Sequence, residues 1–299
     1  MPLHITEFPV PDPESGPYGI TLGPDGALWF TMVHSGHIGR LTPDGDVTTY
    51  PLDTPGTGPT VITPGPDGAL WFTEFRGHRV GRITVTGEVT SFPLPTPDAG
   101  PFGIVTGADG AVWCTEANVG RIARITPDGT VTEFPLPDAG AFPSGIAAGG
   151  DGRLWFTLNQ ANAIGAMSYE GEVTVYPLPT PNAGPVGITA GLDDAMWFVE
   201  IGAGQIGRIE LTGDIREFSL PDPTARPHAI TAGPDDAYWF TEWSSNGIGR
   251  ITPKGEITSS PLPTPSSEPH GITLGPDGAL WTALETGTIA RLTPTTKGS

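Results

Sequence analysis

The sequence predicts an all-β fold, a seven-bladed β-propeller with four antiparallel strands in each blade. Three observations support this prediction. Seven tryptophans recur every 42 residues, variants of the phrase GPDGALWFT surround them, and no segment shows the 3.6-residue apolar period of a helix. Units of this length with four short strands are typical of propeller blades, which bury both faces by stacking. The seven residues are Trp29, Trp71, Trp113, Trp155, Trp197, Trp239 and Trp281.

A single unit, residues 227–263, shows how each element is predicted. Residues 228–233 form a short apolar segment, and Pro234-Asp235-Asp236 is a turn of the kind that Pro and Asp favour. Residues 237–242, AYWFTE, read as a second strand rich in aromatic side chains. Residues 248–252 and 256–262 give the third and fourth strands, with a turn at 253–255 between them.

The two ends of the chain predict how the ring closes. The last unit, residues 269–294, supplies only three strands, whereas residues 5–11 form a fourth strand with no unit before it. We therefore expect the N-terminal strand to complete the last blade and remove its unpaired edge. Residues 1–299 are then one domain. The fourth-strand positions, each 42 residues apart, are Phe8, Tyr50, Phe92, Phe134, Tyr176, Phe218 and Ser260.

Composition excludes several classes of function. The formal net charge of −19 repels phosphate backbones, so we expect no nucleic-acid partner. The single cysteine, Cys114, cannot form an intrachain disulfide and is expected to be a small core residue. No basic region followed by an apolar stretch resembles a signal peptide, and no run is long enough for a membrane span. We expect a cytoplasmic monomer with no membrane partner.

Differences between the repeats point to a site. Just before each first strand stand Tyr18, Thr60, Phe102, Ser144, Val186, His228 and His270. Two positions earlier stand Gly16, Gly58, Gly100, Phe142, Gly184, Arg226 and Glu268. Four residues after the tryptophans, only the seventh unit is acidic, at Glu285. Because the first two strands of a blade are antiparallel, we expect Glu268, His270 and Glu285 to converge, with His228 alongside. On extended backbone, Glu268 and His270 would point the same way.

Two glutamates beside an imidazole suit a divalent cation and a proton acceptor. Carboxylate oxygens are the ligands that Mg²⁺ prefers, and histidine titrates near neutral pH. The alternative interpretation is a set of ordinary polar residues at a loop mouth. Five aromatic residues at the same mouth either form a ligand floor or pack in the core: Tyr18, Phe75, Phe102, Phe142 and Trp243. Residues that recur between units are interpreted as scaffold: Glu74, Glu116, Glu200, Glu242, Arg40, Arg82, Arg124, Arg208 and Arg250.

Segments 19–31 (GITLGPDGALWFT), 268–273 (EPHGIT) and 280–285 (LWTALE) resemble the streptogramin B lyase (virginiamycin B lyase) family. The resemblance covers essentially the whole chain. It implies a lyase that linearises cyclic streptogramin B-type depsipeptides by elimination at the threonyl ester bond, conferring antibiotic resistance. It further implies that Glu268 and Glu285 hold Mg²⁺, that His270 is the catalytic proton acceptor and that His228 contacts the substrate. Trp281-Thr282 departs from the usual Trp-Phe.

Two other functions stay open on the residues alone. A metal-dependent propeller lactonase or esterase would hydrolyse its substrate, and would usually need a richer ring of Asp and Asn ligands. A non-catalytic propeller would use the aromatic mouth to bind a ligand without changing it. The sequence shows no serine or cysteine nucleophile with a partnered base, which agrees with a reaction that has no covalent intermediate.

Overall fold

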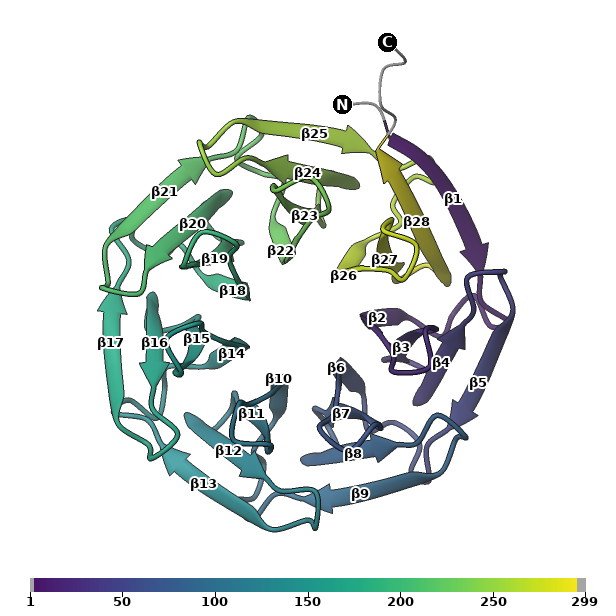
Figure 1. Cartoon of the computed structure of the whole chain (residues 1–299), viewed down its shortest axis with the longest axis horizontal. Helices are drawn as coiled ribbons and strands as arrows, with labels where there is room; N and C mark the ends of the chain where they lie inside the picture. The colour runs from purple at the N-terminus through teal and green to yellow at the C-terminus, as the bar shows by residue number, and fades with distance from the viewer. Residues whose placement is uncertain (1–2, 295–299) are drawn as a thin grey trace.

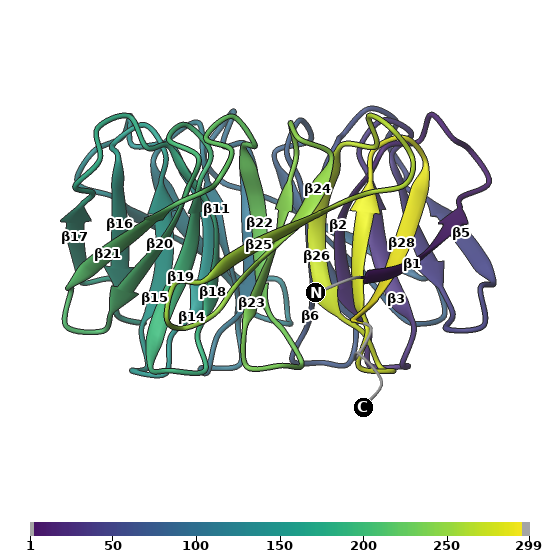
Figure 2. The same ribbon diagram turned by 90° about the horizontal axis from the view of Figure 1, so that it is seen from above.

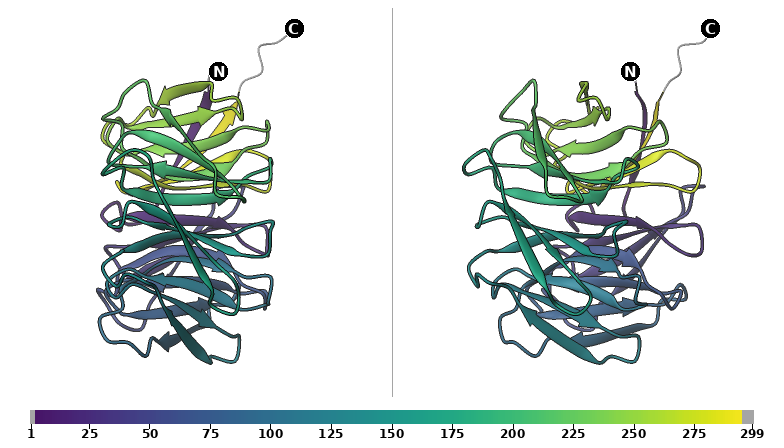
Figure 3. Two further views of the ribbon diagram at one scale, coloured as in Figure 1. Left: turned by 90° about the vertical axis from the view of Figure 1, so that its left-hand side faces the viewer. Right: turned by 60° about the vertical axis from the view of Figure 1, so that its left-hand side comes forward.

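The structure, a computed structural model, describes residues 3–294 as seven four-stranded antiparallel sheets arranged in a ring (Figure 1). Figure 2 and Figure 3 show the ring from other directions, with loops on both of its faces. The predicted all-β, seven-bladed propeller is therefore confirmed. Within residues 3–294, no helix is long and apolar enough to cross a membrane.

Each blade runs from an inner strand near the axis to an outer strand. Blade one comprises β2 (Pro17–Leu22), β3 (Leu28–Met32), β4 (His37–Leu41) and β5 (Val47–Pro51). Blade two comprises β6 (Pro59–Pro64), β7 (Leu70–Glu74), β8 (Arg79–Ile83) and β9 (Val89–Pro93). Blade three comprises β10 (Pro101–Thr106), β11 (Val112–Glu116), β12 (Arg121–Ile125) and β13 (Val131–Pro135). Blade four comprises β14 (Pro143–Ala148), β15 (Leu154–Leu158), β16 (Ala163–Met167) and β17 (Val173–Pro177).

The remaining three blades follow the same order. Blade five comprises β18 (Pro185–Ala190), β19 (Ala195–Glu200), β20 (Gln205–Glu210) and β21 (Ile215–Ser219). Blade six comprises β22 (Pro227–Ala232), β23 (Tyr238–Glu242), β24 (Gly247–Ile251) and β25 (Ile257–Pro261). Blade seven comprises β26 (Pro269–Leu274), β27 (Leu280–Leu284), β28 (Thr288–Pro294) and the N-terminal β1 (Leu3–Pro9).

The N-terminal strand closes the ring, as predicted. β1 pairs antiparallel with β28 from Leu3 opposite Pro294 to Pro9 opposite Thr288. The Phe8 ring stacks on Trp281 at a centroid distance of 5.4 Å, so a fourth-strand aromatic covers the tryptophan here as it does in blades one to five. This pairing leaves β28 with a hydrogen-bonded partner on each side, as the third strand of every other blade has.

A repeated hydrogen-bond unit explains the tryptophan, aspartate and arginine of each repeat. In blade one, Trp29 Nε1 donates to Asp25 Oδ1 at 3.0 Å, and Arg40 Nε donates to Asp25 Oδ2 at 2.7 Å. The tryptophan ring is fully buried, and its only polar atom is satisfied by the turn residue. The same arrangement recurs at Asp67, Asp109, Asp193, Asp235 and Asp277. The scaffold interpretation of the recurring arginines is confirmed.

Thr282, which replaces the usual phenylalanine after the tryptophan, is accommodated by a complementary change in the strand opposite. The Phe30 ring of blade one packs so closely on Gly39 that a Cβ on that glycine would lie 2.1 Å from the ring. In blade seven the smaller Thr282 stands opposite Ala290 instead, and its hydroxyl donates to Gly271 O at 2.8 Å. Blade three makes the same exchange with Cys114, which is fully buried, as expected of a core residue.

The four recurring glutamates are buried at the ends of the second strands. Glu74 is paired with Arg79, its cross-strand neighbour. Burial, followed by the nearby Glu133 carboxylate, raises the pKa of Glu116 to about 8, and burial and Glu217 do the same for Glu200. Glu242 accepts hydrogen bonds from two serine hydroxyls. These contacts lie within blades, in agreement with the scaffold interpretation.

Threonine hydroxyls tie neighbouring blades together at five of the seven interfaces. In each case the residue two positions after the tryptophan donates to a first-strand carbonyl of the next blade. The pairs are Thr31 to Thr60, Thr73 to Phe102, Thr115 to Ser144, Thr157 to Val186 and Thr241 to His270. Val199 and Ala283 occupy this position in blades five and seven. The interfaces between blades five and six and between blades seven and one therefore lack the tie.

Candidate functional site

The start of β26 and the end of β27 bring the predicted acid–histidine set together in blade seven. Glu285 N donates to Glu268 O at 3.2 Å, which joins the two backbone segments that carry the glutamates. Glu268, His270 and Glu285 each offer a ligand atom within 4.8 Å of the others. His270 is buried, and the glutamates on either side of it are half-buried. The convergence expected from the antiparallel strands is present.

The backbone at Glu268 differs from the expectation of an extended segment. Glu268 precedes β26 and has a φ of 52°, in the left-handed region, so the argument that it shares a strand face with His270 is wrong. Glycines hold the same conformation at four equivalent positions: Gly16, Gly58, Gly100 and Gly184. A non-glycine residue here costs free energy of folding, of order 1–3 kcal/mol. Phe142 and Arg226 hold the same conformation in blades four and six, and only in blade seven does this position carry a carboxylate close to a histidine.

His270 and Glu285 are in direct contact. His270 Nε2 hydrogen-bonds Glu285 Oε2, and His34 Nε2 of blade one lies 3.0 Å from Glu285 Oε1. The hydrogen bond from His270, more than any other cause, lowers the pKa of the Glu285 carboxyl. An ionised carboxylate only accepts hydrogen bonds, so His270 donates through Nε2. Its Nδ1 is buried and has no hydrogen-bond partner among the described residues.

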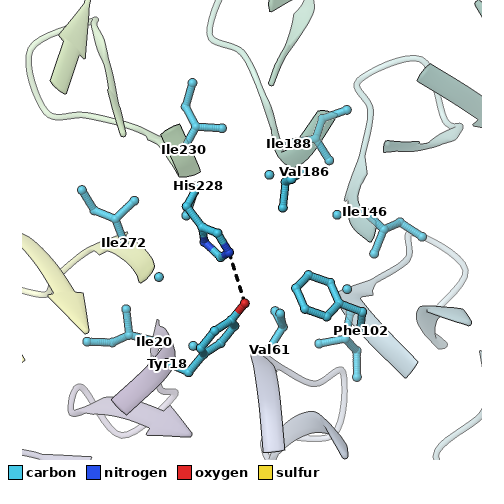
Figure 4. Close-up of a pocket in the computed structure, with 17 residues that line it drawn as sticks. Tyr18, Ile20, Val61, Phe102, Ile146, Val186, Ile188, His228, Ile230 and Ile272 are labelled. Atoms are coloured by element: carbon cyan, nitrogen blue, oxygen red, sulfur yellow. Dashed lines mark hydrogen bonds between the residues drawn. The ribbon is translucent and has the colours of Figure 1, made fainter. Parts of the chain in front are cut away.

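Tyr18 and His228 face His270 from blades one and six. Tyr18 stacks on His270 at a centroid distance of 4.2 Å, and the His228 and His270 rings lie edge to face at 4.8 Å. Tyr18 Oη and His228 Nε2 are hydrogen-bonded at 3.1 Å (Figure 4). Burial, and then His270, lowers the pKa of His228 to about 3, so this ring is neutral. Burial and the nearby Glu285 raise the pKa of Tyr18. The histidines of blades six and seven are neighbours, as predicted.

A central cavity of about 160 Å³ lies beside this pair. Figure 4 shows isoleucines from several blades around it, with the rings of Tyr18, His228 and Phe102 pointing toward its centre. Of the five aromatic candidates, Tyr18 and Phe102 line the cavity, whereas Phe75 packs against Phe102 at 6.4 Å. Trp243 lies under the Arg226 guanidinium at 5.7 Å. Phe142 is not among the lining residues.

Sequence reasoning missed two residues of the site. His34 lies five positions after Trp29, one beyond the position that was compared between repeats, so the same comparison extended by one residue would have found it. Thr241 occupies a repeat position that is threonine in most blades, so a comparison between repeats does not single it out. Its hydroxyl nevertheless contacts His270 O at 2.9 Å. For Tyr18, the sequence indicated an aromatic at the mouth but not its bond to His228.

The donor set of the site fits a divalent cation. Two carboxylates and an imidazole present one ligand atom each within 4.8 Å. Hard cations such as Mg²⁺ are held by one or two carboxylates and keep other positions for water or substrate. The two glutamates thus supply carboxylate ligands for such an ion without enclosing it, and His270 lies beside them.

Fold and site together define a seven-bladed propeller whose acid–histidine cluster lies beside the central axis. Residues 3–292 match the model of the Virginiamycin B lyase family, and the chain belongs to that family. The virginiamycin B lyase of Staphylococcus aureus is 46% identical, with a TM-score of 0.95 over 98% of this chain and 100% of that one.

The chain is also similar to a second virginiamycin B lyase structure and to a curated relative. A catalytically inactive histidine-to-alanine variant of virginiamycin B lyase from S. aureus, solved with quinupristin, is 45% identical over 98% of this chain and 100% of that one, with a TM-score of 0.95. The virginiamycin B lyase of Saccharopolyspora erythraea is 67% identical over 46 residues. That match spans only 15% of this chain and 15% of the relative.

Proposed function

We propose that this protein linearises streptogramin B-type cyclic depsipeptides by elimination at the threonyl ester bond. The convergence of Glu268, His270 and Glu285 beside the apolar cavity carries the proposal. The cluster supplies metal ligands and a base, and the cavity supplies a surface for an apolar ring. The S. aureus relative supports the substrate class, because its inactive histidine variant was solved with quinupristin.

Glu268 and Glu285 would hold Mg²⁺ in this proposal. Bound there, the ion would act as a Lewis acid and stabilise negative charge on a carbonyl oxygen of the substrate. The lowered pKa of Glu285 keeps this carboxylate ionised and able to bind a cation at neutral pH.

His270 would take the proton. In this proposal the imidazole accepts the α-proton of the threonyl residue, and its hydrogen bond to Glu285 orients the ring. The electrons of the broken C–H bond form the new α,β double bond, and the ester carboxylate leaves the β-carbon with the C–O electron pair. Atoms balance without water, so the linear product has the mass of the cyclic substrate.

His228 and Tyr18 would position the substrate. The neutral His228 ring and the Tyr18 hydroxyl are polar groups at the end of an apolar cavity, where they orient a bound ligand by hydrogen bonding. The neutral state of His228 follows from its low pKa, which also makes this ring a poor proton acceptor.

Product mass tests the reaction. The purified protein is incubated with a streptogramin B and Mg²⁺, and the product is examined by mass spectrometry and ultraviolet absorbance. Elimination predicts an opened ring of unchanged mass with a new conjugated double bond. A gain of one water would show a lactonase or esterase, and intact cyclic substrate would show a binding protein.

Removal of the metal tests the role of the glutamates. Excess chelator should abolish turnover, and Mg²⁺ should restore it. The melting temperature should change little, because only one blade carries the ligands and the scaffold contacts do not involve them. Full turnover in excess chelator would contradict the metal role of Glu268 and Glu285.

A further inference from the structure

The recurring buried glutamate has a guanidinium partner in blade two. Glu74, at the end of β7, stands opposite Arg79 at the start of β8. Arg79 Nε donates to Glu74 Oε1 at 2.8 Å, and the same guanidinium bonds Asp53 in the linker before blade two. The side chain of Arg79 thereby neutralises a fully buried carboxylate and connects it to an exposed one.

Blade six has the same glutamate and no arginine. Glu242, at the end of β23, stands opposite Gly247, and a cavity of about 240 Å³ opens beside them. Glu242 and Asp222, which lies in the linker before blade six, both line this cavity. Glu242 is only 4% exposed, and no cationic side chain between residues 3 and 294 pairs with it. None of the lining residues belongs to the acid–histidine cluster.

The contacts of Glu242 leave its charge uncompensated. Ser259 Oγ donates to Oε1 at 2.7 Å and Ser245 Oγ to Oε2 at 3.3 Å, so both oxygens are hydrogen-bonded by neutral groups. Burial raises the pKa of Glu242 in spite of these bonds, and the Asp222 charge acts in the same direction. A buried carboxylate without a cation is costly, and a cation in the cavity would relieve both the burial and the repulsion.

We infer that the cavity at Glu242 and Gly247 binds an alkylguanidinium ligand, which takes the place that the Arg79 side chain fills in blade two. The planar guanidinium has several donors in a fixed fork, and Arg79 shows that this fork can serve both a second-strand glutamate and a linker aspartate. In blade six these acceptors are Glu242 and Asp222, which line the cavity together with Gly247, and Glu242 Oε2 reaches to within 2.7 Å of the position that a Cβ on Gly247 would take.

Ethylguanidinium is the probe that tests the site. Titration calorimetry at constant ionic strength should show saturable binding to the parent protein, and binding should raise its melting temperature. Glu242→Gln keeps the shape of the side chain and removes the charge, so its binding should be at least about tenfold weaker. Ethylammonium, with the same charge but no fork, should also bind at least about tenfold more weakly.

Two exchanged variants provide matched controls. Gly247→Arg should raise the melting temperature and abolish ethylguanidinium binding, because the arginine fills the cavity once the Glu242 carboxylate, 2.7 Å from the position of the new Cβ, has moved aside. Arg79→Gly should lower the melting temperature and create a second site, so that ethylguanidinium restores part of the loss. The inference is overturned if the parent shows no saturable binding, if Glu242→Gln binds equally well, or if ethylammonium binds as tightly as ethylguanidinium.

Discussion

The Thr241 hydroxyl in blade six donates a 2.9 Å hydrogen bond to the backbone carbonyl of His270 in blade seven. The same oxygen accepts a hydrogen bond from Ala229 N, next to His228, at 3.0 Å. One hydroxyl therefore connects the strands that carry both histidines. The corresponding ties from Val199 and Ala283 are missing, so blades six and seven are bonded to each other but not, in this way, to their outer neighbours.

Thr241→Val should lower kcat by more than its loss of folding stability explains. The variant loses two hydrogen bonds, each worth about 1 kcal/mol of unfolding free energy, and Val199 shows that the fold accepts valine here. Thr115→Val, which loses the matching bonds in blade three, is the control. Similar melting temperatures with a lower kcat only in Thr241→Val, recovered in Thr241→Ser, would show positioning. Equal kcat in both valine variants would contradict it.

His270→Ala should reduce turnover by at least about 10²–10⁴-fold, the usual contribution of a general base. Its stability should change little, since other blades carry Thr60, Ser144 or Val186 at this position.

His228→Ala should instead raise KM more than it lowers kcat, because His228 lies one blade away from the glutamates. The measurement is turnover of a streptogramin B by ultraviolet absorbance, beside a melting curve. A His270→Ala variant as active as the parent contradicts the assignment.

Glu268→Gly should stabilise the protein while abolishing its metal-dependent turnover. Glycine relieves a positive φ that four other blades already assign to glycine, so the free energy of unfolding should rise by about 1 kcal/mol. Arg226→Gly relieves the same conformation in blade six and should give a similar gain with turnover that still responds to Mg²⁺. Urea unfolding measures the gain. A less stable Glu268→Gly variant would show that the side chain serves folding.

Deletion of residues 1–11 should destabilise the whole ring. β28 would lose its antiparallel partner along its full length, Trp281 would lose the stacked Phe8 ring, and the hydrogen bond from Thr264 to Glu7 would be lost. Thr6→Ala, a change at an exposed position of the same strand, is the control and should melt like the parent. Thermal unfolding followed by circular dichroism measures the effect. An unchanged melting temperature after the deletion would refute closure by this strand.

Stability should fall as the pH rises toward 8. The pKa values of Glu116 and Glu200 are about 8 in the folded protein, against 4.5 ordinarily, so the folded state binds protons that the unfolded state has released. The contribution is fully present below pH 4.5 and is lost as the pH rises through 8. The double variant Glu116→Gln, Glu200→Gln should flatten the pH dependence of the urea unfolding free energy, whereas the exposed Glu170→Gln should not. Equal slopes would contradict the shifted values.

Sequence periodicity determined the fold and the position of most of the site. Seven tryptophans at a spacing of 42 residues permit one stacked architecture, and the missing fourth strand of the last unit required the N-terminal segment to fill it. The repeats also acted as internal controls, because a residue such as Glu285 that only one unit carries is not needed by the scaffold. These conclusions depend on local pattern and on antiparallel pairing, both of which a linear sequence records.

Only the tertiary structure decided which residues from different blades are in contact. The left-handed backbone at Glu268, the bond between Tyr18 and His228 at a separation of 210 residues, and the approach of His34 to Glu285 depend on how the ring closes. Partners from different blades meet only when all seven sheets are stacked, and burial then sets their protonation. The same holds for the cavity at Gly247, which exists only because segments far apart in the sequence surround it.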